Sequence, residues 1–144
     1  MRQGELTISR IELKNKQMAL CFFDSNLYGQ LPFGDTITPM ERVLVDSDHK
    51  QIVYIVESED QWHYIRFPET VWARLDEVIA QSGDLFLIIS LTDKGEPARS
   101  IPLKKMAEEC RELVANIRHN ANYGPELPEL VEVKFKQTIA QLTR

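Results

Sequence analysis

The chain has 144 residues, of which 43% are hydrophobic and 27% charged, and its formal net charge is −5. This composition is typical of a single globular domain, residues 1–144, that needs no disulfide or metal to fold, and it excludes extensive disorder. The negative charge and the scattered basic residues argue against nucleic acid as a partner, and apolar runs such as residues 85–89 are too short to cross a membrane.

The N-terminal region predicts a β-hairpin. Apolar residues alternate over 6–13 with a change of parity at Ser9–Arg10, which indicates a strand with a bulge. A turn at Asn15 leads into a strong second strand over residues 17–24.

Residues 25–40 predict a surface loop, because their two glycines and two prolines break both helix and central strand. A short edge strand near residues 27–31 is compatible with this interpretation. Four side chains are too apolar for a free linker, so we expect them to cover the sheet or a partner: Leu27, Tyr28, Leu31 and Phe33.

Residues 42–72 are the most informative stretch. They predict three strands joined by two polar turns: residues 42–46, 51–57 and 62–67. The middle strand contains an unbroken apolar run, which indicates burial on both faces and a central place in its sheet.

A helix follows, beginning at Pro68 and closed by Ser82–Gly83, with Gly83 as the residue that tolerates a left-handed cap. Apolar residues recur at helical spacing on one face, and Asp76 belongs to the opposite, polar face.

Residues 84–91 predict another interior strand. Residues 92–102 predict a loop or a ragged hairpin, because Pro97 and Pro102 restrict any pairing to a sheet edge.

An unbroken apolar stripe predicts a helix over residues 103–117, and a last helix is predicted over residues 126–142. Their short connection indicates an antiparallel helix pair on one face of the sheet. The predicted fold is therefore α+β: a mostly antiparallel sheet of about five or six strands with three helices.

The turn at residues 46–49 is the densest polar cluster. Asp46 and Asp48 are candidate ligands for a divalent metal, but the segment lacks the alternating ligands and the closing Glu of an EF-hand. The plainer interpretation is an Asx-type turn between two strands.

The loop at residues 119–125 has two competing interpretations. Asn120, Asn122 and Tyr123 are candidates for binding a polar ligand, or they form the hydrogen-bonding cap between two helices.

Catalytic and cofactor signatures are not recognisable in the sequence. His63 has no identifiable nucleophile or orienting carboxylate, which favours a surface or structural histidine. Cys21 and Cys110 lie far apart in apolar patterns without metal spacing, and no signal segment opens the sequence. We therefore expect no catalytic residues, no metal, no cofactor, two buried thiols and a cytoplasmic location.

Four segments carry a resemblance to a known family: RVLVDSD at residues 42–48, the YI–E pattern at 54–57, P-x-T-x-W at 68–72 and ANYG at 121–124. They resemble the YjbL-like proteins, a small uncharacterised family of Bacillus and its relatives. The likeness runs from about residue 42 to the C-terminus, and the chain looks longer than the family at its N-terminus and within residues 25–40 and 92–102. The resemblance implies a cytoplasmic bacterial protein without an assigned activity and gives no functional residues to carry over.

Three functions remain as hypotheses. The sequence favours a non-enzymatic binding or protein-interaction module whose apolar loop, residues 27–33, contacts a protein partner or a second copy. A small metal-dependent hydrolase using Asp46 and Asp48 is the alternative from another class. A small-ligand sensor with a pocket near Asn120, Asn122 and Tyr123 is the third.

Overall fold

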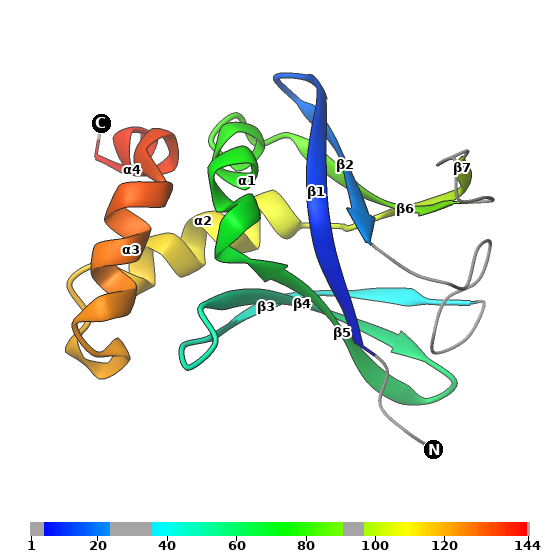
Figure 1. The fold of residues 1–144 in the computed structure, drawn as a ribbon, viewed down its shortest axis with the longest axis horizontal. Helices are drawn as coiled ribbons and strands as arrows, with labels where there is room; N and C mark the ends of the chain where they lie inside the picture. The colour runs from blue at the N-terminus through cyan, green and yellow to red at the C-terminus, as the bar shows by residue number, and fades with distance from the viewer. Residues whose placement is uncertain (1–4, 24–35, 91–96, 144) are drawn as a thin grey trace.

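Seven strands form one curled, mixed sheet within residues 5–23, 36–90 and 97–143, which are the residues that the computed structural model describes (Figure 1). The strands are β1 (Glu5–Asn15), β2 (Met18–Phe23), β3 (Thr38–Asp46), β4 (Gln51–Ser58), β5 (Gln61–Pro68), β6 (Asp84–Ser90) and β7 (Pro97–Pro102). The α-helices are α1 (Trp72–Ile79), α2 (Met106–Ile117), α3 (Glu126–Lys134) and α4 (Lys136–Leu142), and two short 3-10 helices are η1 (Glu69–Val71) and η2 (Ala121–Tyr123). The predicted α+β class is confirmed.

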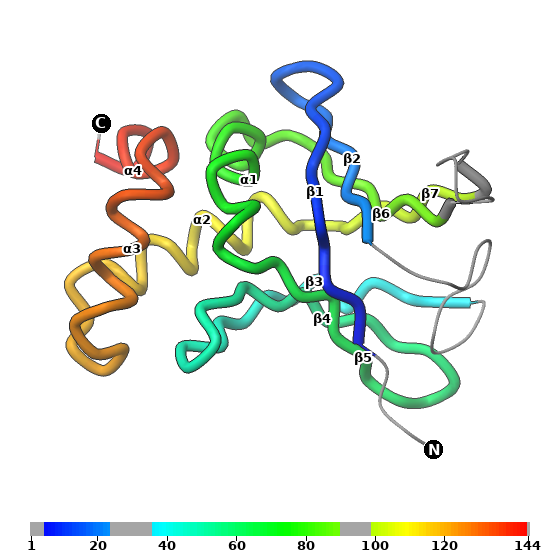
Figure 2. Tube along the Cα trace, in the orientation of Figure 1, coloured from blue at the N-terminus to red at the C-terminus, as the bar shows by residue number. Residues whose placement is uncertain are grey.

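The N-terminal hairpin lies in the middle of the sheet. β1 pairs with β2 antiparallel, and a register shift between Ile8 and Arg10 confirms the predicted bulge. β1 also pairs in parallel with β5, and β2 in parallel with β6, so the strand order is β3-β4-β5-β1-β2-β6-β7. The sheet has seven strands where about five or six are predicted; four of its six strand pairs are antiparallel, so it is mostly antiparallel as predicted, with these two parallel pairs in addition. Figure 2 shows the chain passing from β5 through α1 into β6, and β5 and β6 flank the β1–β2 hairpin on opposite sides.

The β3–β4–β5 meander confirms the predicted three strands. All five residues of the apolar run in β4, residues 52–56, are buried, as expected for an interior strand, and β4 lies between β3 and β5. At the other end of the sheet, β7 is an edge strand paired with β6, as its two prolines predict.

The hydroxyl of Tyr54 joins the two ends of the curled sheet. It donates a hydrogen bond to the carbonyl oxygen of Lys104, between β7 and α2, at 2.8 Å. Helix α2 packs against both β3 and β6, so it closes the space between the two ends.

The main core lies between the inner face of the sheet and the helices. Trp72 on α1 packs against Phe135 with ring centroids 5.4 Å apart, and its indole Nε1 donates to the carbonyl of Phe67 at 2.8 Å. The other large side chains that are almost completely buried are Tyr54, Phe67, Ile8, Ile52, Ile55, Ile65, Leu75, Ile79, Leu85 and Leu87.

Gly83 is needed for a close approach rather than for a left-handed cap. The left-handed residue after α1 is Ser82, with φ of 55°. A Cβ atom on Gly83 would lie 2.6 Å from Val78 Cγ2 and 2.8 Å from the backbone of Gln17. The predicted role of Gly83 is therefore wrong, although the predicted end of the helix is close to the observed one.

The C-terminal region forms two helices where one is predicted. Helix α3 ends at Lys134, Phe135 takes a non-helical conformation (φ −109°, ψ 45°), and α4 begins at Lys136. Figure 1 shows α3 crossing α2, and α3 packs on α1, α2 and α4. The predicted antiparallel pair on one face of the sheet is therefore wrong, because the short connection after α2 turns the chain away from the sheet.

The start of α2 also differs from its prediction. Lys105 has a left-handed backbone (φ 61°), so the helix begins at Met106 instead of residue 103. Within the described ranges, no helix has the length and apolar character needed to cross a membrane.

Candidate functional site

Asp46 closes the turn between β3 and β4. Its Oδ1 accepts a hydrogen bond from the His49 amide at 3.2 Å, and its Oδ2 lies 2.9 Å from His49 Nδ1. Arg66 on β5 donates to the same Oδ2 at 3.1 Å. Partial burial by itself raises the pKa of Asp46, but the hydrogen bonds from His49 and Arg66 outweigh it and hold that pKa below its usual value.

Arg66 connects this turn to the rest of the sheet. It also donates to Gln51 Oε1 at 3.1 Å and to Glu5 Oε1 at 3.0 Å, so one guanidinium ties β1, β3, β4 and β5 together. Asp48 is exposed. Within the described residues, no group of three or more His, Cys, Asp or Glu side chains is arranged to hold a metal ion. Asp46 thus takes part in a turn and an ion pair, and none of the described residues adds a third ligand to Asp46 and Asp48.

Asn120, Asn122 and Tyr123 lie together at η2. Asn120 Oδ1 accepts a hydrogen bond from the Asn122 amide at 3.0 Å, which satisfies the first turn of the 3-10 helix. Asn122 is exposed, and Tyr123 is half-buried against the core. The four apolar residues predicted to form an interaction surface, Leu27, Tyr28, Leu31 and Phe33, lie outside the described residues.

Three buried groups with potential reactivity sit in the core. The thiols of Cys21 and Cys110 are free, and burial raises the pKa of both. His63 is buried on β5, with Nε2 3.2 Å from the carbonyl oxygen of Ser58. The prediction of two buried thiols is confirmed, and His63 takes a structural position.

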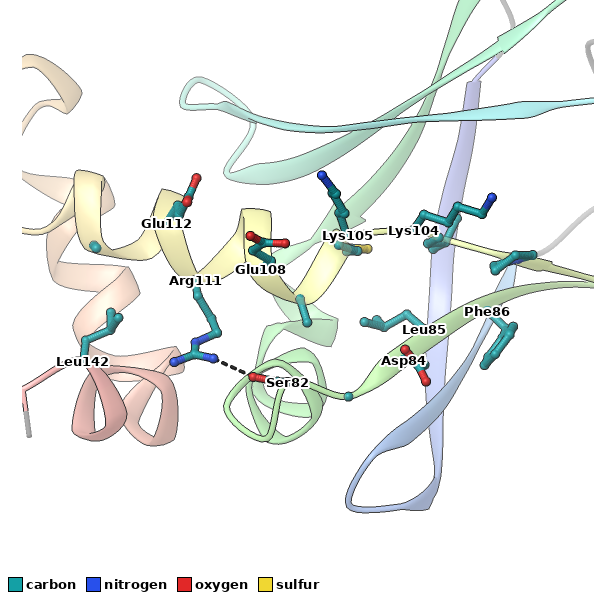
Figure 3. A pocket seen from close by; sticks show the side chains of 16 residues that line it. Ser82, Asp84, Leu85, Phe86, Lys104, Lys105, Glu108, Arg111, Glu112 and Leu142 are labelled. Atoms are coloured by element: carbon teal, nitrogen blue, oxygen red, sulfur yellow. Dashed lines mark hydrogen bonds between the residues drawn. The ribbon is translucent and has the colours of Figure 1, made fainter.

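A half-open groove of about 620 Å³ runs beside the first turns of α2 (Figure 3). We call it the α2 groove. One wall is the segment at residues 82–86, where α1 turns into β6, and the other is the chain from Pro102 into α2. Leu142 of α4 lines it as well. Its apolar lining includes the buried Leu85, Leu103 and Met106.

Charged side chains of both signs surround this apolar lining. Arg111 donates a hydrogen bond from Nη1 to the Ser82 hydroxyl at 2.5 Å and so connects α2 to the turn after α1 (Figure 3). The other charged lining residues are Asp84, Lys104, Lys105, Glu108 and Glu112. An apolar floor with fixed polar groups around it suits binding and orienting of a ligand.

The sequence carries no signal for the α2 groove, because its walls come from separate segments of the chain. The groove runs along α2 from Met106 to Ala115, whereas the predicted ligand residues Asn120 and Asn122 follow the C-terminal end of that helix. The prediction also misses Asp76, which belongs to the polar face of its helix in the sequence but is buried in the structure.

Comparisons with known proteins match the chain to a family whose function is unknown. The model of a family of unknown function, UPF0738, matches residues 6–135. A UPF0738 protein of Bacillus cytotoxicus is 33% identical over 123 residues, which cover 85% of this chain and 92% of that protein. UPF0738 proteins from two strains of Bacillus cereus are 29% identical over 133 residues, covering 92% of this chain and 98% of each relative.

The match starts at residue 6, so the family likeness includes the N-terminal hairpin that the resemblance from residue 42 onward leaves out. No solved structure matches the chain. The chain belongs to the UPF0738 family, an uncharacterised family with members in Bacillus.

Proposed function

We propose that this chain is a non-enzymatic binding module that holds a segment of a partner protein in the α2 groove. The observation that supports the proposal is the groove itself: about 620 Å³ of space over an apolar floor, between two walls that belong to different elements. Proteins commonly bind ligands in pockets of this volume with a mostly apolar lining.

The shape of the groove favours a protein segment over a metabolite. Small-molecule sites enclose most of their ligand, whereas this groove is only half enclosed. An extended or helical segment needs such an open groove, because its ends must continue into the rest of the partner. Apolar anchors of the segment would contact Phe86, Pro102 and Leu142, which line the groove and are not buried.

The polar groups around the groove suit the same occupant. Lys105 and Arg111 carry positive charge and Glu108 and Glu112 negative charge along one side of α2. Charges of both signs give a bound segment a fixed direction more than they add affinity. The two buried free thiols suit a reducing compartment, so we expect the partner to be a cytoplasmic protein.

Two neighbouring residues on α2 provide a matched test. Ala115 and Asn116 are both exposed, but only Ala115 lines the groove. A photo-crosslinking amino acid, p-benzoylphenylalanine, is placed at either position and the protein is irradiated in living cells of its own host. We expect a discrete adduct with one protein from position 115 and none from position 116.

The crosslinking positions 115 and 116 also distinguish docking in the groove from its alternatives. Identical adducts from both positions, or none from either, would contradict docking in the groove. A small-ligand sensor is the rival: a metabolite that raises the melting temperature of the wild type but not of Ala115→Trp would assign the groove to a small molecule instead.

A further inference from the structure

The outer face of the β3–β4–β5 meander carries exposed apolar side chains far from the α2 groove in sequence. Trp62 is 45% exposed and Leu44 is 49% exposed. Leu44 on β3 pairs with Val53 on β4, and Val53 pairs with Arg66 on β5. Trp62, which pairs with Glu57, lies on β5 an even number of residues from Arg66, so Trp62 and Leu44 are on the same face of the sheet. Side chains directly opposite one another share a face of the sheet.

An apolar stripe connects these two residues. Tyr64 pairs with Ile55 between the Trp62 and Arg66 positions, on the same face. We call the resulting set the Trp62 stripe: Leu44, Val53, Ile55, Tyr64 and Trp62. Val53 and Ile55 are buried, so the two ends of the stripe offer the accessible apolar surface.

Charge differs between the two ends of the Trp62 stripe. At the Leu44 end, Arg66 is neutralised by Asp46 and Glu5. At the Trp62 end lie three carboxylates, on Glu57, Glu59 and Asp60, and none of them forms an ion pair with any described residue.

A hollow of about 330 Å³ lies at this acidic end, and Glu57, the cross-strand partner of Trp62, lines it. It is lined by Thr36, Thr38, Glu57, Ser58, Glu59 and Asp60. The negative face of an exposed indole ring attracts cations. Carboxylates beside it bind cations through charge-assisted hydrogen bonds.

We propose that the Trp62 stripe is a docking surface for a basic protein segment, with Arg or Lys side chains against Trp62 and in the acidic hollow and apolar side chains along the stripe toward Leu44. A second copy of this chain fits less well, because each copy would bring the same three carboxylates and a net charge of −5 to the contact. This surface is separate from the α2 groove and does not depend on the proposed function.

Trp62 itself reports on the contact. The chain has two tryptophans, and the other, Trp72, is completely buried in the core. The probe is the peptide acetyl-hexa-arginine amide, titrated while tryptophan emission and its quenching by acrylamide are recorded. We expect Trp62 to be protected from acrylamide, with acetyl-hexa-glutamate amide giving no change.

Two double variants that remove equal charge test whether the acidic end is responsible. Glu59→Gln/Asp60→Asn removes the turn carboxylates, and Glu69→Gln/Glu129→Gln removes two exposed carboxylates elsewhere. We expect the first to weaken peptide binding at least about tenfold and the second to leave it within about twofold. Trp62→Ala, followed by anisotropy of a labelled peptide, is expected to weaken binding by a similar factor.

Four results would overturn the proposal. These are an equal loss in both double variants, full affinity in Trp62→Ala, and no binding at millimolar peptide. The fourth is sedimentation showing dimers that Trp62→Ala dissociates, which would make a second copy the occupant.

Discussion

Asp76 on α1 holds the beginning of α4 through Thr138. Asp76 Oδ1 accepts hydrogen bonds from the Thr138 amide at 2.8 Å and from its hydroxyl at 2.6 Å, and both side chains are buried. Its Oδ2 accepts from the Gln137 amide at 3.0 Å. The carboxylate thereby caps a helix 60 residues further along the chain, and this explains why the C-terminal helix restarts after Phe135.

Asp76→Ala is expected to destabilise the protein by about 3 kcal/mol, because it leaves the buried amide and hydroxyl of Thr138 and the part-buried amide of Gln137 without their carboxylate acceptor. Urea unfolding measures the loss, and hydrogen exchange should show α4 opening first. Glu77→Gln is the control on the same helix, since Glu77 forms only an exposed ion pair with Arg74 at 3.5 Å, and we expect a change below about 0.5 kcal/mol. Equal midpoints for the two variants would contradict the capping role.

Gly83→Ala should cost about 2 kcal/mol, because the new Cβ would lie 2.8 Å from the backbone of Gln17, which cannot move without disturbing the hairpin. Gly124→Ala tests a different mechanism. A Cβ there meets nothing within 4 Å, but φ is +76°, so its cost of about 1 kcal/mol is conformational. Urea unfolding of both variants checks the pair, and a neutral Gly83→Ala would refute the steric requirement.

The two-residue turn between β4 and β5 stores backbone strain. Glu59 and Asp60 both have positive φ, 53° and 63°, which is the type I′ conformation that Asn-Gly adopts without penalty. Glu59→Asn/Asp60→Gly is therefore expected to stabilise the protein by about 1 kcal/mol. Lys16→Asn/Gln17→Gly, in the β1–β2 turn where neither residue has positive φ, should give no gain. Thermal melts of both double variants decide whether the gain is specific to this turn.

Stability is expected to decrease at alkaline pH. Burial raises the pKa of Cys21, Cys110 and Tyr54. In the unfolded chain the thiols lose protons from about pH 8.5 and the phenol from about pH 10, whereas the folded protein keeps all three neutral. Their contribution is therefore complete below pH 8.5 and is lost as the pH rises above that value.

Urea midpoints between pH 7.5 and 10.5 measure this decrease. Cys110→Ala removes one of the three groups, so its midpoint should fall less steeply with pH than that of the wild type. The native thiols should also resist Ellman's reagent at pH 8 and react only in urea. A midpoint that stays flat to pH 10.5 would show that these groups ionise equally in both states.

Strands that are buried on both faces could be predicted from the sequence. The run in β4 contains five consecutive apolar residues, and the structure buries every one of them. The bulge near Ser9 could also be predicted, because the alternation of apolar residues changes parity there. In both cases the cause lies within the strand itself, so a local pattern records it.

Features that depend on a distant partner could not be predicted. The apolar spacing of residues 127–142 continues through Phe135, and the break in the helix depends on Asp76. The α2 groove combines Leu85, Met106 and Leu142, which meet only in three dimensions. The parallel neighbours of β1 and β2 are also invisible, because a strand's own sequence does not name the strand beside it.

The central position of the β1–β2 hairpin sets the order of events during synthesis. Its two outer edges find their neighbours only when β5 and β6 have left the ribosome, since Leu6 pairs with Ile65 and Cys21 with Leu87. Until then both edges present unpaired amides and carbonyls, the condition that favours aggregation of nascent chains. The hairpin is thus synthesised before the strands that complete its pairing, and we expect slow folding dominated by contacts between distant residues.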